Sequence, residues 1–167
     1  SAGTYTSVIT GVSSSRFTAG STGTCSCSNG NFNWTLSETS SGSTNWNLVI
    51  TNVDQSAPSL SSSSPTDNAT GIATNANIVL TFSEAVDAES GNITIKKTSD
   101  DSTIETIDVT GAKVSGSGST EITINPDTDL TADVDYYVLI DATAFDDTAG
   151  NSYAGISSTT ALNFSTK

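Results

Sequence analysis

The sequence predicts an all-β protein in which two antiparallel sheets face each other across an apolar layer. Three observations lead to this fold class. Hydrophobic residues make up 34% of the 167-residue chain, and they fall in short alternating runs. Clusters of Gly, Asn, Asp and Pro separate these runs, and no long stretch has helical periodicity. Six or seven short strands in about 110 residues are typical of a β-sandwich.

Residues 58–167 supply the strands of this sandwich. Because side chains i and i+2 of a strand lie on one face, alternating apolar residues mark the buried face. We expect strands, in chain order, near 77–83, 92–97, 104–110, 120–125, 134–141 and 159–166. The residues expected to point between the sheets are Ile78, Leu80, Phe82, Ile93, Ile95, Ile122, Ile124, Tyr136, Val138 and Ile140. Residues 141–145 are expected to form a single helical turn.

Residues 1–57 are predicted to be an additional N-terminal β segment, because Asp54-Gln-Ser-Ala-Pro58 interrupts the pattern. The predicted division is therefore 1–57 and 58–167. Within the first part we expect strands at 4–10 and 15–19, followed by a hairpin of 31–37 and 45–51. Four short strands bury too little surface to be stable alone. The segment is therefore expected to pack on the sandwich, complete another sheet or pair with a neighbouring subunit.

The charge of the chain excludes some classes of function. The net charge is −13, and sixteen of the 18 acidic residues lie in residues 58–167. Such a surface repels phosphate backbones, so nucleic acid is not an expected partner. The chain holds no His, which removes the Ser-His-Asp triad and most zinc chemistry. No run is long enough for a membrane span, and any secretion signal is expected to have been removed or to lie on a larger precursor.

A resemblance to a known family covers about residues 58–167, roughly two thirds of the chain. The residues that carry it are Ser64-Pro-Thr-Asp67, Gly71-Ile72, Asn77-Ile-Val-Leu-Thr-Phe-Ser-Glu84, Ser90-Gly-Asn-Ile93, Asn125-Pro126, Tyr136-Tyr137, Asp147-Thr-Ala-Gly-Asn151 and Asn163-Phe-Ser-Thr166. This part resembles the bacterial Ig-like domains that occur as tandem repeats in large surface adhesins and in secreted multidomain proteins. The resemblance implies an immunoglobulin-like antiparallel β-sandwich without chemistry of its own, located outside the cell or on its surface.

Calcium is the cofactor that the acidic loops favour. The loop Asp146-Asp-Thr-Ala-Gly-Asn151 places two carboxylates and an amide around a glycine turn, with Asp141 just upstream. Ca²⁺ takes six to eight oxygen ligands, including carboxylates and carbonyls. Asp54, in the linker, resembles the linker aspartates that share calcium between consecutive modules of such arrays. The predicted metal residues are Asp54, Asp141, Asp146, Asp147 and Asn151. The alternative is that these side chains only cap turns.

Three further groups of residues allow more than one interpretation. Trp34 and Trp46 could form a platform for sugar rings, although the regular i, i+2 spacing of the apolar residues in their strands favours burial in a small core. Cys25 and Cys27 are too close for an unstrained bridge, which leaves free thiols, a strained local disulfide or links to another chain. Glu84 with Asp87 or Glu89 could be drawn as a hydrolytic pair, but nothing suggests an enclosing cleft. No catalytic residue is therefore predicted.

The leading functional prediction is a non-catalytic structural or adhesive module of an exported bacterial cell-surface protein, stiffened by calcium. Its expected partners are neighbouring Ig-like modules or copies of itself. One alternative is a subunit of an extracellular filament that assembles by strand donation. Another is a carbohydrate-binding accessory module that uses Trp34 and Trp46 against a surface polysaccharide.

Overall fold

The computed structural model describes the backbone of residues 22–27, 30–38 and 46–52 and all atoms of residues 54–167. The chain divides into two compact units, residues 1–54 and residues 55–167. Each unit is described by itself below.

The N-terminal unit contains a three-stranded antiparallel sheet in the order β1-β2-β3. Its strands are β1 (Thr22–Cys27), β2 (Gly30–Glu38) and β3 (Trp46–Asn52). The predicted hairpin is confirmed, because β2 pairs with β3 in a continuous register that sets Trp34 opposite Ile50. β1 was not predicted, since its small polar residues lack apolar alternation. The strands predicted at 4–10 and 15–19 lie outside the described residues.

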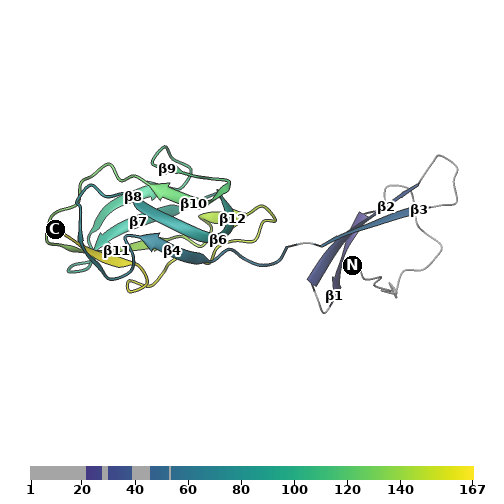
Figure 1. Ribbon diagram of the computed structural model, residues 1–167, viewed down its shortest axis with the longest axis horizontal. Coiled ribbons are helices and arrows are strands. Elements are labelled where there is room, and N and C mark those ends of the chain that lie inside the picture. The colour runs from purple at the N-terminus through teal and green to yellow at the C-terminus, as the bar shows by residue number, and fades with distance from the viewer. Residues whose placement is uncertain (1–21, 28–29, 39–45, 53) are drawn as a thin grey trace. The chain divides into compact units, whose positions relative to one another are not determined.

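Residues 55–167 form two facing sheets (Figure 1). The first, called here the β6 sheet, contains β4 (Leu60–Ser64), β6 (Ile78–Ala88), β9 (Val114–Ser115), β10 (Ser119–Ile124) and β12 (Phe145–Asp147). The second, called here the β11 sheet, contains β5 (Ala69–Ile72), β7 (Asn92–Lys97), β8 (Thr103–Asp108), β11 (Asp135–Ile140) and β13 (Asn163–Thr166). Every pairing is antiparallel except that of β5 with β13.

The core lies between these sheets and includes the alternating residues that the sequence marked, alongside others such as Phe145, Tyr153 and Phe164. All ten predicted inward side chains are at most 3% exposed. Phe82 lies at one end of this layer, with its ring centroid 5.4 Å from that of Phe145 and 5.1 Å from that of Tyr153. Burial of one such side chain contributes about 1.5–3 kcal/mol. The apolar layer is therefore what holds the two sheets together.

A buried tyrosine fixes the start of β11. The hydroxyl of Tyr136 accepts a hydrogen bond from the backbone N–H of Thr131 at 2.9 Å, five residues upstream. A tyrosine near the start of a strand that bonds to the backbone just before it is a hallmark of immunoglobulin-like sandwiches. The predicted fold class, an all-β immunoglobulin-like sandwich with an additional N-terminal β segment, is confirmed.

β6 is longer than predicted, and it carries partners on both edges. Its first half pairs with β4, and its last residues pair with β12. On its other edge, the pairing with β10 jumps from Thr81 opposite Glu121 to Val86 opposite Ser119. Between these two pairs, four residues of β6 (82–85) lie opposite the single residue Thr120 of β10, which makes the stretch 82–85 irregular. Residues 141–145 form a hydrogen-bonded turn, in which Ala144 N–H donates to the Asp141 carbonyl, and not the expected helical turn.

Candidate metal site

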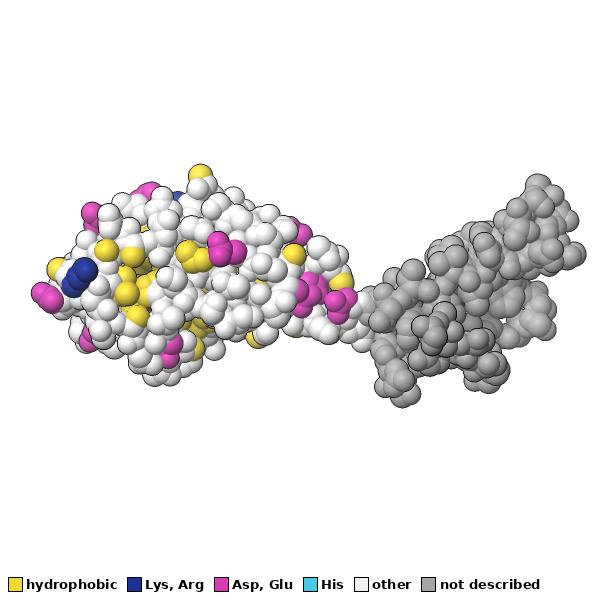
Figure 2. Space-filling view, viewed as in Figure 1, with side chains coloured by type: hydrophobic (Ala, Val, Ile, Leu, Met, Phe, Trp, Pro, Cys, Tyr) yellow, Lys and Arg dark blue, Asp and Glu magenta, His cyan; other side chains and the backbone are white. Residues whose placement is uncertain are grey.

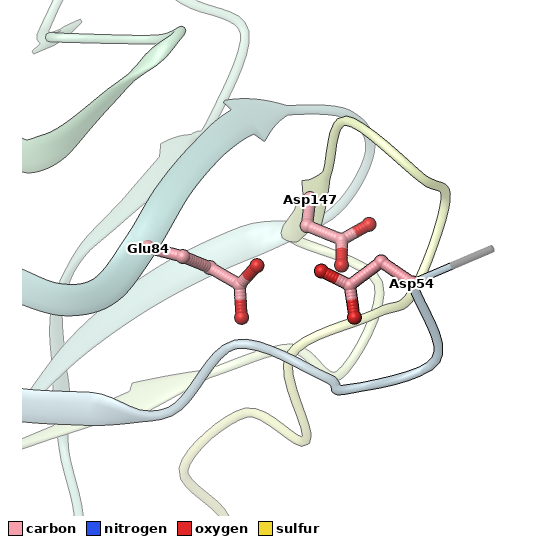
Figure 3. Close-up of side chains that lie close together, drawn as sticks. All are labelled: Asp54, Glu84 and Asp147. Carbon is pink, nitrogen blue, oxygen red and sulfur yellow. The ribbon is translucent and has the colours of Figure 1, made fainter. Parts of the chain in front are cut away.

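Three carboxylates from distant parts of the sequence converge at one end of the sandwich. They belong to Asp54, Glu84 and Asp147, and one carboxylate oxygen of each lies within 4.8 Å of the others. Figure 3 shows the three side chains pointing toward one another, from the entering chain, from β6 and from β12. In the space-filling view, acidic side chains gather at the end of the sandwich where the chain enters (Figure 2).

Asp147 is the most firmly held of the three. It lies opposite the fully buried Val86, so its side chain is on the inward face, and it is 6% exposed. Its Oδ1 accepts hydrogen bonds from the N–H groups of Ala149 and Asn151, both at 2.8 Å. Its Oδ2 accepts one from Nδ2 of Asn151, also at 2.8 Å. The turn-capping role considered for Asp147 is therefore present in the structure, and the Asn151 side chain supports it by bonding to the same carboxylate.

These hydrogen bonds also set the charge of Asp147. Burial raises the pKa of its carboxyl, but the bonds from the side chain and backbone of Asn151 and from the backbone of Ala149 outweigh burial. The pKa therefore lies below its ordinary value of 3.8. Because donors favour the charged form of a carboxyl, Asp147 is an anion at neutral pH.

Glu84 reaches the site from the irregular stretch of β6. An extra residue in one strand bends that strand and re-aims its side chains, and such bulges often lie beside functional sites. Glu84 is partly buried. The bulge, which no spacing rule in the sequence reveals, explains why Glu84 was not predicted as a metal ligand. The only sequence feature that marks it is its position after an apolar strand, in Phe82-Ser-Glu84.

The entering segment is fixed beside β6 by two backbone contacts. The N–H of Ser83 donates to the Ser59 carbonyl at 2.9 Å, and the N–H of Ser59 donates to Oγ of Ser83 at 3.0 Å. Pro58 is buried in the same segment. Since Ser83 precedes Glu84, these contacts hold the entering chain next to the acidic cluster. Asp54 itself is exposed.

The structure brings together only part of the predicted metal set. Asp54 and Asp147 are in the cluster, and Asn151 is bonded to Asp147. Asp141 is outside the cluster, and its Oδ2 accepts the N–H of Asn92 at 2.8 Å. Asp146 is also outside it, because neighbouring residues of a strand point to opposite faces.

The other predicted residues lie in the N-terminal sheet. Cys25 and Cys27 are both in β1, opposite Phe32 and Gly30 respectively. Trp34 lies in β2 opposite Ile50, and Trp46 begins β3 opposite Glu38. The side chains of these residues are outside the described part of the chain, so their contacts stay predictions.

The two facing sheets and the tyrosine at the start of β11 define the class as an immunoglobulin-like sandwich. More specifically, the chain belongs to the bacterial Ig-like domain family, whose sequence pattern matches residues 54–166. No curated protein and no solved structure gives a significant match to the chain. Domains of this family are structural modules of bacterial surface proteins and are generally non-catalytic. Within the described residues, no helix has the length and hydropathy of a membrane span.

Proposed function

We propose that this protein is a non-catalytic structural and adhesive module of an exported bacterial cell-surface protein, and that calcium stiffens it where the chain enters the sandwich. The family supports the first part of the proposal. The observation that carries the second part is the convergence of Asp54, Glu84 and Asp147.

The donor set fits Ca²⁺ in kind and in spacing. Three carboxylates offer hard oxygen ligands, which Ca²⁺ binds at 2.3–2.6 Å. Two oxygens on one ion at about 2.4 Å can be at most about 4.8 Å apart, and the three carboxylate oxygens lie within 4.8 Å of one another. Asp147 is already oriented by Ala149 and Asn151. Three carboxylates this close repel one another, and a divalent cation bound between them would offset that repulsion.

Bound calcium would tie the end of the entering chain to β6 and β12, which already pair with each other. Asp54 lies on the entering chain, Glu84 on β6 and Asp147 on β12. The ion would therefore limit the freedom of the chain just before the sandwich. This is the property that a spacer needs if consecutive modules are to keep a fixed direction.

Calorimetric melting of the full chain in Ca²⁺ and in EGTA tests the calcium part. A ligand that binds only the folded state adds about 2.7 kcal/mol at one hundred times its Kd, so Ca²⁺ should raise the melting temperature of the sandwich. Calorimetry is preferred because both tryptophans lie in residues 1–57, outside the sequence of the sandwich.

Three variants make the test specific. Glu84→Gln should abolish the calcium-dependent shift. Asp129→Asn, which changes an exposed acid outside the cluster, should keep the shift. Asp141→Asn should also keep it, because Asp141 lies outside the cluster. An unchanged melting temperature on adding Ca²⁺ to the parent protein would reject the metal site and leave the spacer role standing.

The two alternatives stay predictions with separate tests. Strand donation into a filament predicts assembly that light scattering detects, and reductant should reduce it if Cys25 and Cys27 link subunits. A carbohydrate-binding role predicts that polysaccharides change the fluorescence of Trp34 and Trp46. Neither result would depend on calcium at the acidic cluster.

A further inference from the structure

The first and last strands of the β11 sheet, in chain order, are paired with each other in parallel. β5 lies beside β13, with Ala69 opposite Phe164 and Ile72 opposite Thr166. Backbone hydrogen bonds close both ends of the pair. Asn68 N–H donates to the Asn163 carbonyl at 2.8 Å, and Lys167 N–H donates to the Ile72 carbonyl at 3.0 Å. The first and last strands of the β11 sheet in chain order are therefore connected along the whole length of β13.

A side chain adds a further connection at the start of this pair. Oδ1 of Asp67 accepts the backbone N–H of Asn163 at 3.0 Å, across 96 positions of sequence. Oδ2 of the same carboxylate accepts Nδ2 of Asn68 at 2.7 Å. Asp67 thus links the segment before β5 directly to the first residue of β13.

β13 is also hydrogen-bonded along its other edge. It pairs with β11, and the side chain of Thr166 is 4% exposed. The Thr166 hydroxyl donates to the Thr131 carbonyl at 2.6 Å, and its backbone N–H donates to the Val134 carbonyl at 3.1 Å. β13 therefore cannot peel away from the sheet without breaking bonds on both edges.

The direction of the strands decides how tension acts on this pair. The segment that enters the sandwich before β4 and the C-terminus lie at opposite ends of the sandwich (Figure 1). A pull on both ends draws β5 toward its N-terminus and β13 toward its C-terminus, so the two strands are sheared along their axes. The hydrogen bonds at both ends of the pair and the bond to Asp67 cross between the two strands, so shear acts on all of them, although the register shifts between Phe164 and Thr166. These bonds are therefore loaded together and not opened one after another.

We propose that the β5–β13 pair, closed by Asp67, is a mechanical clamp that resists tension applied between the ends of the sandwich. Force applied at the N-terminal side of the sandwich acts on β4 before it acts on β5. Detaching β4 from β6 only lengthens the extended chain that transmits the force to the β5–β13 pair. The proposal rests on the proposed function as a module in series, since only a tethered module bears such a load.

Force-clamp unfolding of the full chain, tethered by its two ends in EGTA, tests this proposal. Asp67→Ala removes the two hydrogen bonds described above. Asp108→Ala is the matched control, because exposed Asp108 also accepts two bonds, from N–H and Oγ1 of Thr110 in a local turn. Loss of one clamp bond should speed unfolding at constant force about five-fold, which corresponds to ~1 kcal/mol. The Asp108 variant should match the parent protein.

Asp67→Asn provides the rescue, since its amide oxygen can still accept the Asn163 N–H. Unfolding events of the sandwich are recognised by the length gain that residues 55–167 give. Equal rates for Asp67→Ala and Asp108→Ala at equal chemical stability would overturn the clamp. Because the assay contains no free calcium, this outcome is independent of the calcium-dependent melting shift, and either proposal can fail alone.

Discussion

The ammonium of Lys113 lies 2.6 Å from Oε1 of Glu105, in a network that closes one side of the sandwich. The same Nζ is 2.6 Å from Oδ2 of Asp127. Oε2 of Glu105 also accepts the backbone N–H groups of Asp127 at 3.1 Å and Thr128 at 3.3 Å. Glu105 is on β8, Lys113 precedes β9, and Asp127 follows β10. One carboxylate therefore ties an edge of the β11 sheet to an edge of the β6 sheet.

Replacing Glu105 by Ala should destabilise the sandwich by roughly 2–3 kcal/mol, because hydrogen bonds to charged groups are stronger than neutral ones. The Glu105 side chain is only 9% exposed, so solvent does not replace its bonds fully. Asp127→Ala should cost much less, since Asp127 is 71% exposed and surface ion pairs contribute little. Urea unfolding followed by circular dichroism measures both values. Similar costs for the two variants would contradict the central role of Glu105.

The same network predicts a loss of stability at alkaline pH. Hydrogen bonds to Asp127 and Glu105 raise the pKa of Lys113 above its ordinary value of 10.5. A folded-state pKa that is raised contributes stability that is fully present below 10.5 and is lost as the pH rises through the folded value. The difference in unfolding free energy between the parent protein and Lys113→Met should therefore shrink from about pH 9 to about pH 12. If the difference in unfolding free energy between the two proteins stayed constant across this range, the contribution of charged Lys113 to stability would be refuted.

Asp146→Asn should stabilise the sandwich. Asp146 lies directly opposite Asp87 on neighbouring strands, and its Oδ1 is buried without a hydrogen-bond partner in the described residues. Like charges directly across a strand pair are destabilising by roughly 0.2–1 kcal/mol, and an amide removes one charge and adds a donor. Thermal melting measures the gain. Asp141→Asn is the contrasting variant and should give no gain, because Asp141 already accepts the Asn92 N–H.

The sequence predicted the strands whose burial alternates, and it missed those whose formation depends on neighbours. β7 matches its predicted range, because Ile93 and Ile95 fix its inward face. β4 is the serine-rich segment Leu60–Ser64. It has no apolar alternation in its sequence, and it is a strand because it pairs with β6. β12 was read as part of a loop, since Phe145-Asp-Asp147 carries a single large apolar side chain.

The candidate site was predicted by residue type more successfully than by position. Asp54 and Asp147 were identified as oxygen donors, and both are in the cluster. Glu84 was considered only as a hydrolytic acid, because its approach to Asp147 depends on the irregular register of β6. Asp146 was included because it adjoins Asp147, yet strand alternation turns it away. Local spacing cannot reveal which face of a short strand meets a distant segment.

Leu60–Ile72 contributes β4 to one sheet and β5 to the other within thirteen consecutive positions. Neither sheet can complete its strand pairing until this short stretch has adopted its native conformation. The β6 sheet and the β11 sheet should consequently form in a single cooperative event. A synthetic peptide of residues 60–72, added to a chain that lacks these residues, should restore strand pairing in both sheets at once.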